Sequence, residues 1–294
     1  MISVVVISKD EEGLDDTLAS LAKQLDGLDE PAEIVVVDAS AGRLDHIKQH
    51  HSDTVRWLDF QPRPDVRVTI PHQRNTGVRA AQGEIIAFTD AGCLPGDGWL
   101  ARLIAPLRAG ESAVAGTSRD MSGELVFPSQ HIIRVEQVGD ASYLAECPTL
   151  NFAFTRAVYD ALGGFDEGFA YGSDVDFTWR LNDAGYKVRY VADASIQHDY
   201  GVSRRQRRRS YIYGKGRARL YKKHRGRRKD VLRNDPMVVV YPLFLLGLPL
   251  TLVFPIYPLL LLIPAWRNRS DGIIRVLVDH LWFGAGVLAE IAGR

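Results

Sequence analysis

The sequence predicts an α/β fold in which a mostly parallel sheet is flanked by helices, followed by a basic and then an apolar helical region. Three observations lead to this prediction. Over residues 1–203, apolar β-branched runs alternate with segments whose apolar residues recur at helical spacing. Beyond them lie a run dense in Lys and Arg and then 28 residues without a charge. With 294 residues, 46% of them hydrophobic, the chain can bury a sizeable core, which excludes wholesale disorder.

The first predicted strand, residues 2–7, is a β-branched run without polar alternation, typical of a strand covered on both faces. Strands that alternate with helices indicate a mostly parallel sheet with helices on both faces. Residues 41–65 and 118–150 are irregular and receive no assignment. The other strands are expected at residues 34–37, 66–70, 84–89, 113–117 and 187–191, and helices at 14–25, 75–81, 99–107, 155–162 and 174–184.

Charge divides the chain although its formal total is zero. Residues 1–203 hold 17 Lys and Arg against 31 Asp and Glu, a net charge of −14. Residues 204–233, the basic strip, hold 15 against one, a net charge of +14. We therefore expect three parts: a globular domain at 1–203, a basic segment at 204–236 and an apolar tail at 237–294.

The cysteines and the N-terminus indicate the compartment. Cys93 and Cys147 are too few for a disulfide framework and lack metal-ligand spacing, so a reducing cytosolic environment is expected. The apolar residues 2–7 are too short for a secretory signal, and no basic segment precedes them. The globular part is therefore expected to stay in the cytosol.

Two lone carboxylates stand directly after predicted strands: Asp38 follows residues 34–37, and Asp90 follows residues 84–89. In an open parallel sheet the ligand crevice lies beyond the carboxyl ends of the strands, so both positions are candidates for a binding site. The alternative for each is an ordinary cap or turn residue. The motifs around them favour the site.

A series of short motifs runs through the globular part in a recognisable order. The motifs are QRNTG at 73–77, AAQGE at 80–84, FTDAG at 88–92, NFAF at 151–154, GGFDE at 163–167, GSDVDF at 172–177 and AGY at 184–186, followed by His198, Gly201 and Ser203. Each motif alone is weak, and the ordered set is strong. Together they resemble family 2 glycosyltransferases, which are inverting enzymes of the GT-A fold, over about residues 2–203.

The resemblance implies a nucleotide-sugar donor, whose diphosphate leaving group develops charge that the site must neutralise. Asp90 matches the family's metal-binding aspartate, and His198 matches the histidine that completes the metal site in many members. The implied cofactor is Mn²⁺ or Mg²⁺, for which an imidazole is a minority ligand beside oxygens. The alternative for His198 is a solvated loop histidine.

The same resemblance assigns the remaining site residues. Asp174 matches the general base that takes a proton from the acceptor hydroxyl, with helix capping as an alternative or additional role. Asp38 matches the aspartate that contacts the nucleotide base, and Glu11 lies in the first loop, where the family contacts the nucleoside. Arg74 is a candidate to bind a phosphate, and its alternative is a plain surface arginine.

The sequence departs from the family pattern at two positions. The usual Asp-x-Asp metal motif is D-A-G at 90–92, so metal ligation is expected to depend on Asp90, His198, the diphosphate and water. Ser173 replaces the glutamate that commonly precedes the base. That replacement leaves the class of acceptor open.

The basic strip and the tail indicate contact with a membrane. We expect anionic lipid rather than nucleic acid as the partner of the strip, because no nucleic-acid-binding motif accompanies it. A solvated charge run, and arginines that hold the phosphates of the donor or of a lipid-linked acceptor, are the alternatives.

The apolar segment 237–264 is long enough to span a bilayer, but its five prolines argue against one straight helix. A bent hairpin that dips into the membrane, or two short helices, is expected, with residues 273–291 as an interfacial helix. Two complete spans are the competing layout. Arg267 and Arg269 follow the segment, so both of its ends are expected on the cytosolic side.

The sequence thus predicts an inverting, metal-dependent glycosyltransferase at the cytosolic face of the cell membrane. Its expected donor is a nucleotide sugar, with UDP preferred, and its expected acceptor is held near the bilayer, as a lipid-linked molecule or a cell-envelope glycan precursor would be. Two other classes stay open: a catalytically silent binding or scaffold protein with a GT-A-like fold, and a nucleotidyltransferase. The oligomeric state is open as well.

Overall fold

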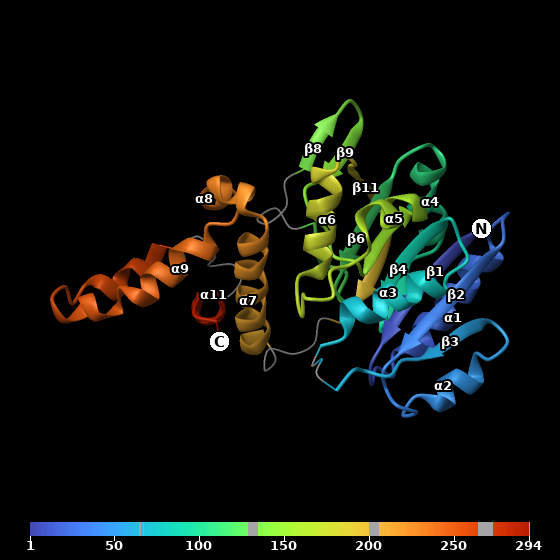
Figure 1. Ribbon diagram of the computed structural model, residues 1–294, viewed down its shortest axis with the longest axis horizontal. Helices are drawn as coiled ribbons and strands as arrows, with labels where there is room; N and C mark the ends of the chain where they lie inside the picture. The colour runs from blue at the N-terminus through green and yellow to red at the C-terminus, as the bar shows by residue number, and fades with distance from the viewer. Residues whose placement is uncertain (65, 67, 129–134, 200–205, 264–272, 294) are drawn as a thin grey trace. The chain divides into compact units, whose positions relative to one another are not determined.

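A computed structural model describes residues 1–64, 66, 68–128, 135–199, 206–263 and 273–293 (Figure 1). The chain divides into two compact units, Met1–Tyr200 and Gly201–Arg294, and each is described here by itself. The motif residues Gly201 and Ser203, the first residues of the basic strip, and Arg267 and Arg269 lie outside the described residues.

The described part of the N-terminal unit is built on one sheet of eleven strands, in the order β3-β2-β1-β4-β10-β6-β11-β9-β8, with β5 paired to β11 and β7 paired to β6. The strands are β1 Ile2–Ser8, β2 Ala32–Asp38, β3 Val55–Asp59, β4 Ile85–Asp90, β5 Cys93–Pro95, β6 Ala113–Arg119, β7 Leu125–Phe127, β8 Val135–Val138, β9 Ala141–Leu144, β10 Asn151–Thr155 and β11 Val188–His198.

The sheet is mixed, so the predicted parallel arrangement holds for only part of it. Strands β3, β2, β1 and β4 are parallel neighbours, as are β6 and β11. Strand β10 runs antiparallel between β4 and β6, and the pairs formed by β5, β7, β8 and β9 are antiparallel too. An apolar run such as Asn151–Thr155 does not encode its direction, and no helical segment precedes it to signal the crossover connection that a parallel neighbour needs.

The strand predicted at residues 66–70 is also wrong. The third strand in chain order is β3, which lies in a stretch that received no assignment, and helix α3 already begins at Ile70. Pro71 stands in the first turn of this helix, where its missing N–H costs nothing. Strand β3 escaped detection because it is a short strand that pairs with β2 alone and carries Arg56 and Asp59 among its apolar residues.

Helices cover both faces of the sheet, as predicted. Residues of α1, α2 and α4 join one hydrophobic cluster, and residues of α3, α5 and α6 join the cluster on the opposite face (Figure 1). The bounds agree with the predicted helices to within a turn, except that α3 starts earlier and that α2 was not predicted. These helices are α1 Leu14–Asp26, α2 Asp45–His50, α3 Ile70–Ala80, α4 Trp99–Arg108, α5 Arg156–Leu162 and α6 Ser173–Asp183.

Helix α3 lies unusually close to the sheet at Gly77. A Cβ atom there would run into Cγ1 of Val5 on β1 and would lie 3.2 Å from Cγ2 of Val37 on β2. Only glycine lets the helix backbone approach these strands so closely. The close approach places the first half of α3, which carries Arg74, at the strand ends.

Gly77→Ala is therefore expected to destabilise the protein by about 1–3 kcal/mol through overpacking, although alanine is the better helix former. Chemical denaturation of the purified protein measures this change. Gly226→Ala is the matched control, because nothing lies within 4 Å of a Cβ at that position. A Gly77→Ala protein as stable as the control would contradict the close packing of α3.

The described part of the C-terminal unit is helical. Prolines interrupt its apolar segment as predicted: Pro242 lies inside α9, and Pro249 and Pro258 stand in the first turns of two short 3₁₀ helices. Within the described residues, none of the helices combines the length and the apolar character needed to cross a bilayer. The elements are α7 Gln206–Lys223, η2 Arg225–Asp230, α8 Val231–Asn234, α9 Met237–Leu246, η3 Leu248–Leu252, η4 Tyr257–Leu261 and α11 Ile273–Ile291.

Helices α7 and α11 pack directly against each other at two glycines. A Cβ atom at Gly214 would run into the carbonyl oxygen of Phe283, and one at Gly286 would run into the carbonyl oxygen of Tyr211. The final predicted helix, residues 273–291, therefore forms with the expected bounds and is held by the helix that carries much of the basic strip.

Candidate active site

The register of the parallel strands aligns the two predicted strand-end carboxylates. Asp38 pairs with Ser8 in the β1–β2 ladder, and Asp90 pairs with the preceding residue, Ile7, in the β1–β4 ladder. The two carboxylates thus flank the carboxyl end of β1 on either side. This is the edge at which parallel sheets bind ligands, and the prediction that both residues share it is confirmed.

His198 reaches the same edge from a distant part of the chain. It is the last residue of β11, and it pairs with Cys93 of β5 in an antiparallel ladder. Strand β5 begins only three residues after Asp90. This short ladder therefore joins His198 to the D-A-G segment at 90–92, and His198 is a strand residue rather than a loop histidine.

The side chain of Asp90 is partly buried, and its enclosed Oδ1 atom has no hydrogen-bond partner among the residues that the structure describes. Burial raises the pKa of Asp90, the Arg74 guanidinium and the nearby His198 imidazole lower it, and the negative charge of Asp174 raises it further. These charges act on Asp90 only because the fold brings them near it. The predicted metal ligands and the predicted base, scattered along the sequence, therefore share one electrostatic neighbourhood.

Arg74 links the third helix to the helix that carries Asp174. Its Nη1 atom donates a hydrogen bond to Oγ of Ser173 at 3.1 Å, and its guanidinium carbon lies 5.6 Å from the ring centre of Phe165. Arg74 is only 6% exposed, so the alternative of a plain surface arginine is wrong. A buried cation whose Nε atom has no hydrogen-bond partner is suited to an anionic ligand.

Asp174 stands in the first turn of α6, next to Ser173. Its Oδ1 atom accepts a hydrogen bond from the N–H of Val175 at 2.9 Å. This bond goes to the next residue in the chain, and the N-terminus of α6 has no side-chain capping bond, so the capping role is not observed; the bond occupies only one carboxylate oxygen. Ser173, which replaces the family's usual glutamate, is 2% exposed and is the partner of Arg74.

Asp38 is held by the turn that follows β2. Its Oδ1 atom accepts hydrogen bonds from the backbone N–H of Ser40 at 3.2 Å and from the Ser40 hydroxyl at 2.5 Å. Burial raises the pKa of Asp38, the bonds from Ser40 lower it, and the carboxylates of Asp59 and Asp10 raise it. The turn role proposed as the alternative for Asp38 is therefore real, and it leaves the other carboxylate oxygen, Oδ2, outside these bonds.

Glu11 lies beside the position where the metal motif lacks its second carboxylate. Gly92 occupies that position with a positive φ of 84°, and a Cβ atom on it would lie 3.6 Å from the carboxyl carbon of Glu11. The backbone N–H of Gly13 points at Glu11 Oε1, 3.4 Å away. Glu11 thus contributes a carboxylate next to the D-A-G segment, on the same side of the sheet edge as Asp90.

Sequence reasoning missed the buried amides that hold α3 in place. The carboxamide of Gln73 donates to the carbonyl oxygens of Ser8 and Val37, at the ends of β1 and β2. Asn75 donates to the carbonyl of Phe165 and accepts from its N–H, both at 2.9 Å. Both residues lie in the motif at 73–77, and amides on a helix that packs against strand ends are the signal that could have identified them.

A divalent cation fits the residues at this edge. The enclosed Oδ1 of Asp90 is an oxygen acceptor without a donor, and carboxylate oxygens suit Mg²⁺ and Mn²⁺. A second group of metal-ligating side chains, Asp15, His50 and His51, contains none of the predicted ligands. It is a separate feature of the N-terminal unit.

Comparison with known proteins supplies the family. The model described as "Glycosyl transferase family 2" matches residues 3–170, and the model described as "Glycosyl transferase family group 2" matches residues 119–278. The first match covers more than half of the chain. The chain therefore belongs to the family 2 glycosyltransferases.

Two relatives and one solved structure illustrate the range of similarity. Glycosyltransferase AglE of Haloferax volcanii is 26% identical over 159 residues, which cover 50% of each chain. The pre-mycofactocin glycosyltransferase of Mycobacterium tuberculosis is 32% identical over 172 residues, covering 51% of this chain and 34% of that protein. The chain thus spans half or less of the length of these relatives.

The solved structure is the mannosyltransferase PcManGT of Pyrobaculum calidifontis in complex with GDP-Man and Mn²⁺. It superposes with a TM-score of 0.66 at 18% identity, covering all of this chain and 87% of that one. At this identity the likeness establishes the fold, and the predicted GT-A type of fold is confirmed.

Proposed function

We propose that this chain is an inverting glycosyltransferase that moves a sugar from a nucleotide-sugar donor to an acceptor hydroxyl. The observation that carries the proposal is the placement of Asp90 and His198 at one edge of the sheet, with Arg74 hydrogen-bonded to Ser173, the neighbour of Asp174. A site of this kind combines a carboxylate that can act as base with a cationic group, Arg74, that favours a departing diphosphate.

Asp174 is proposed as the general base. As the acceptor oxygen attacks the anomeric carbon, the bond from that carbon to the diphosphate oxygen breaks, and the electron pair leaves with the nucleoside diphosphate. The acceptor proton passes to the carboxylate of Asp174. Arg74, buried and hydrogen-bonded to the uncharged hydroxyl of Ser173, is proposed to bind the diphosphate and to hold the N-terminus of α6 in position.

Asp90 and His198 are proposed to hold a divalent cation, Mn²⁺ or Mg²⁺. When bound, such an ion would neutralise charge on the departing diphosphate. The proposal is supported by the enclosed oxygen of Asp90 and by the Mn²⁺ that the Pyrobaculum mannosyltransferase binds together with GDP-Man. Glu11, beside Gly92, lies where it can support the same ion or the nucleoside.

Asp38 and Glu11 are proposed to contact the nucleoside. The Oδ2 atom of Asp38 is available to accept a hydrogen bond from a base N–H, since both bonds from Ser40 go to Oδ1. A UDP-sugar is the first donor to test. GDP-Man, the ligand of the Pyrobaculum mannosyltransferase, is the second.

The decisive assay supplies a panel of nucleotide sugars with Mn²⁺ or Mg²⁺, with and without membrane lipid, and measures the release of free nucleoside diphosphate. Release from one donor supports the proposal. Release of pyrophosphate from a nucleoside triphosphate would identify a nucleotidyltransferase instead. If no donor binds and no turnover occurs under any condition, the alternative of a catalytically silent scaffold, suggested by the incomplete metal motif, is favoured.

The C-terminal unit is proposed to bind the cytosolic face of a membrane and to hold the site near a lipid-linked acceptor. Support comes from the apolar side chains that this unit leaves in solvent: Leu252 is 89% exposed, Ile256 71% and Val253 70%. An apolar surface of this extent marks an interaction site. The basic helix α7 in the same unit suits an anionic surface.

Replacing both Leu252 and Val253 by Asp is expected to weaken binding to anionic vesicles by about tenfold or more, since each buried apolar side chain contributes roughly 1.5–3 kcal/mol. Vesicle flotation measures this, and added salt is expected to weaken binding of the unaltered protein as well. Leu125→Asp, at an exposed apolar residue of the N-terminal unit, is the control. Equal flotation of all three proteins would refute the membrane assignment.

A further inference from the structure

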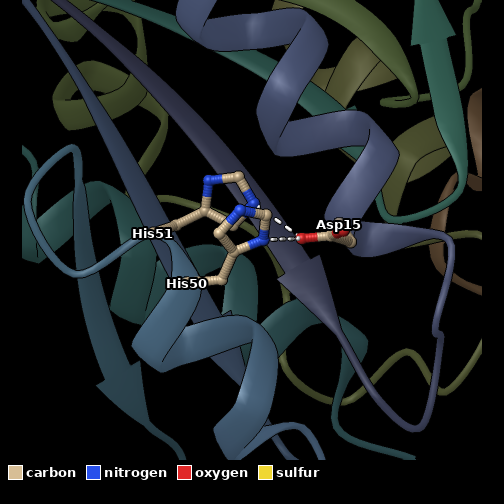
Figure 2. Close-up of side chains that lie close together, drawn as sticks. All are labelled: Asp15, His50 and His51. Carbon is tan, nitrogen blue, oxygen red and sulfur yellow. Dashed lines mark hydrogen bonds and ion pairs between the residues drawn. The ribbon is translucent and has the colours of Figure 1, made fainter.

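A cluster of one carboxylate and two imidazoles joins α1 to the end of α2. His50, the last residue of α2, and His51, which follows it, both point at the carboxylate of Asp15 in the first turn of α1 (Figure 2). The Nδ1 atom of His50 lies 2.9 Å from Asp15 Oδ1, and the Nε2 atom of His51 lies 2.8 Å from the same oxygen. The sugar-transfer chemistry uses none of these three residues.

We propose that Asp15, His50 and His51 form a zinc site, separate from the strand edge that carries Asp90. Their three ligand atoms lie within 4.8 Å of one another. A tetrahedral Zn²⁺ with bonds of about 2.0–2.1 Å holds its ligand atoms roughly 3.3 Å apart. To admit the ion, the imidazole nitrogens would withdraw from the carboxylate oxygen by about half an ångström and would move closer to each other within the 4.8 Å that bounds the cluster.

The kinds of ligand atom in the cluster favour one metal over others. Two imidazole nitrogens and one carboxylate oxygen suit Zn²⁺, whereas Mg²⁺ and Mn²⁺ prefer oxygen ligands. The site is also accessible from solvent, because the side chain of His50 is 68% exposed and that of Asp15 is 43% exposed. His51, with 9% side-chain exposure, anchors the cluster to the protein interior. Water or an added ligand would complete the fourth position.

A bound zinc ion would hold α2 against the start of α1, and this site is called the clamp below. This helix has only six residues, and a helix so short is not stable by itself. One turn earlier, His46 contacts Glu12 at 3.0 Å, so two histidine–carboxylate contacts connect the same pair of segments. The segment between Asp38 and α2 includes Ser40, which binds Asp38 and accepts a hydrogen bond from the backbone N–H of Asp10. Zinc at the clamp would stabilise the turn that holds Asp38.

The test uses titration calorimetry to measure Zn²⁺ binding to the chelator-treated chain of 294 residues and to three variants of it. The unaltered protein is expected to bind one tight equivalent, and Asp90→Asn is expected to retain it. His50→Gln is expected to weaken binding by about tenfold or more, since losing even an outer-shell partner costs 10–100-fold. His46→Gln, which removes an equally exposed imidazole from the same helix, is expected to bind like the unaltered protein.

Thermal unfolding provides the second readout and shows that each variant folds. Added Zn²⁺ is expected to raise the melting temperature of the unaltered protein and of His46→Gln, and to leave His50→Gln unchanged, because a ligand stabilises only the fold that binds it. No tight equivalent in the unaltered protein overturns the proposal. If His46→Gln lost as much Zn²⁺ binding as His50→Gln, the binding would be nonspecific chelation at the surface. If Asp90→Asn lost it, the zinc would lie at the strand edge. Either result also overturns the proposal.

Discussion

Asp174→Asn is expected to lower the rate of sugar transfer by about 10²–10⁴-fold, the range typical of a lost general base. The amide cannot accept the proton of the acceptor hydroxyl, but it is nearly isosteric with the carboxylate. Its Oδ1 atom can still accept the hydrogen bond from Val175, so the first turn of α6 should stay intact. Donor binding, measured by calorimetry, should therefore be unchanged while the turnover rate falls.

The matched control for this variant is Asp183→Asn, at the last residue of the same helix. Asp183 is exposed, so its replacement should leave both transfer and donor binding as they are. Full transfer activity in the Asp174→Asn protein would refute the assignment of the base. Loss of donor binding would instead show that Asp174 acts on the donor side.

Asp90→Asn is expected to lower activity without lowering the stability of the fold. Transfer and metal-dependent donor binding should fall by about 100-fold or more, as for other losses of a group that stabilises developing charge. The melting temperature of the metal-free protein should stay the same or rise. The reason is that burial raises the pKa of Asp90 and one of its oxygens has no hydrogen-bond donor, so the charged form is costly to enclose.

Asp97→Asn is the control for this pair of measurements. It makes the same chemical change at an exposed carboxylate in the loop after β5. Neither donor binding nor melting temperature should change in it. If the Asp90→Asn protein kept full transfer that a chelator still abolishes, the metal would be held elsewhere, and the proposed role of Asp90 would be wrong.

The sequence predicted the elements whose apolar residues form a simple pattern. Strands β1 and β4 are continuous apolar runs, helices α1 and α4 carry apolar residues at helical spacing, and the predicted positions of all four were correct. Strand β3 was missed because polar residues interrupt it, and the direction of β10 was missed because strand direction depends on the connection and not on composition. Local pattern therefore identified elements better than their pairing.

The site shows the same limit. That Asp38 and Asp90 lie at one edge followed from the rule for parallel strands and was correct. The burial of Arg74 and its bond to Ser173, 99 residues away in the sequence, could not be predicted, because a tertiary contact at that separation leaves no periodic signal. The cluster of Asp15 with His50 and His51 was missed for the same reason.

The ladder between β5 and β11 has a mechanical consequence. His198 ends β11, and the N-terminal unit itself ends at Tyr200, so the covalent connection to the second unit leaves directly beside a proposed metal ligand. The short ladder with Cys93 therefore fixes the proposed ligand and the exit of the chain from this unit at once. A substitution that disturbed this pairing would displace both together.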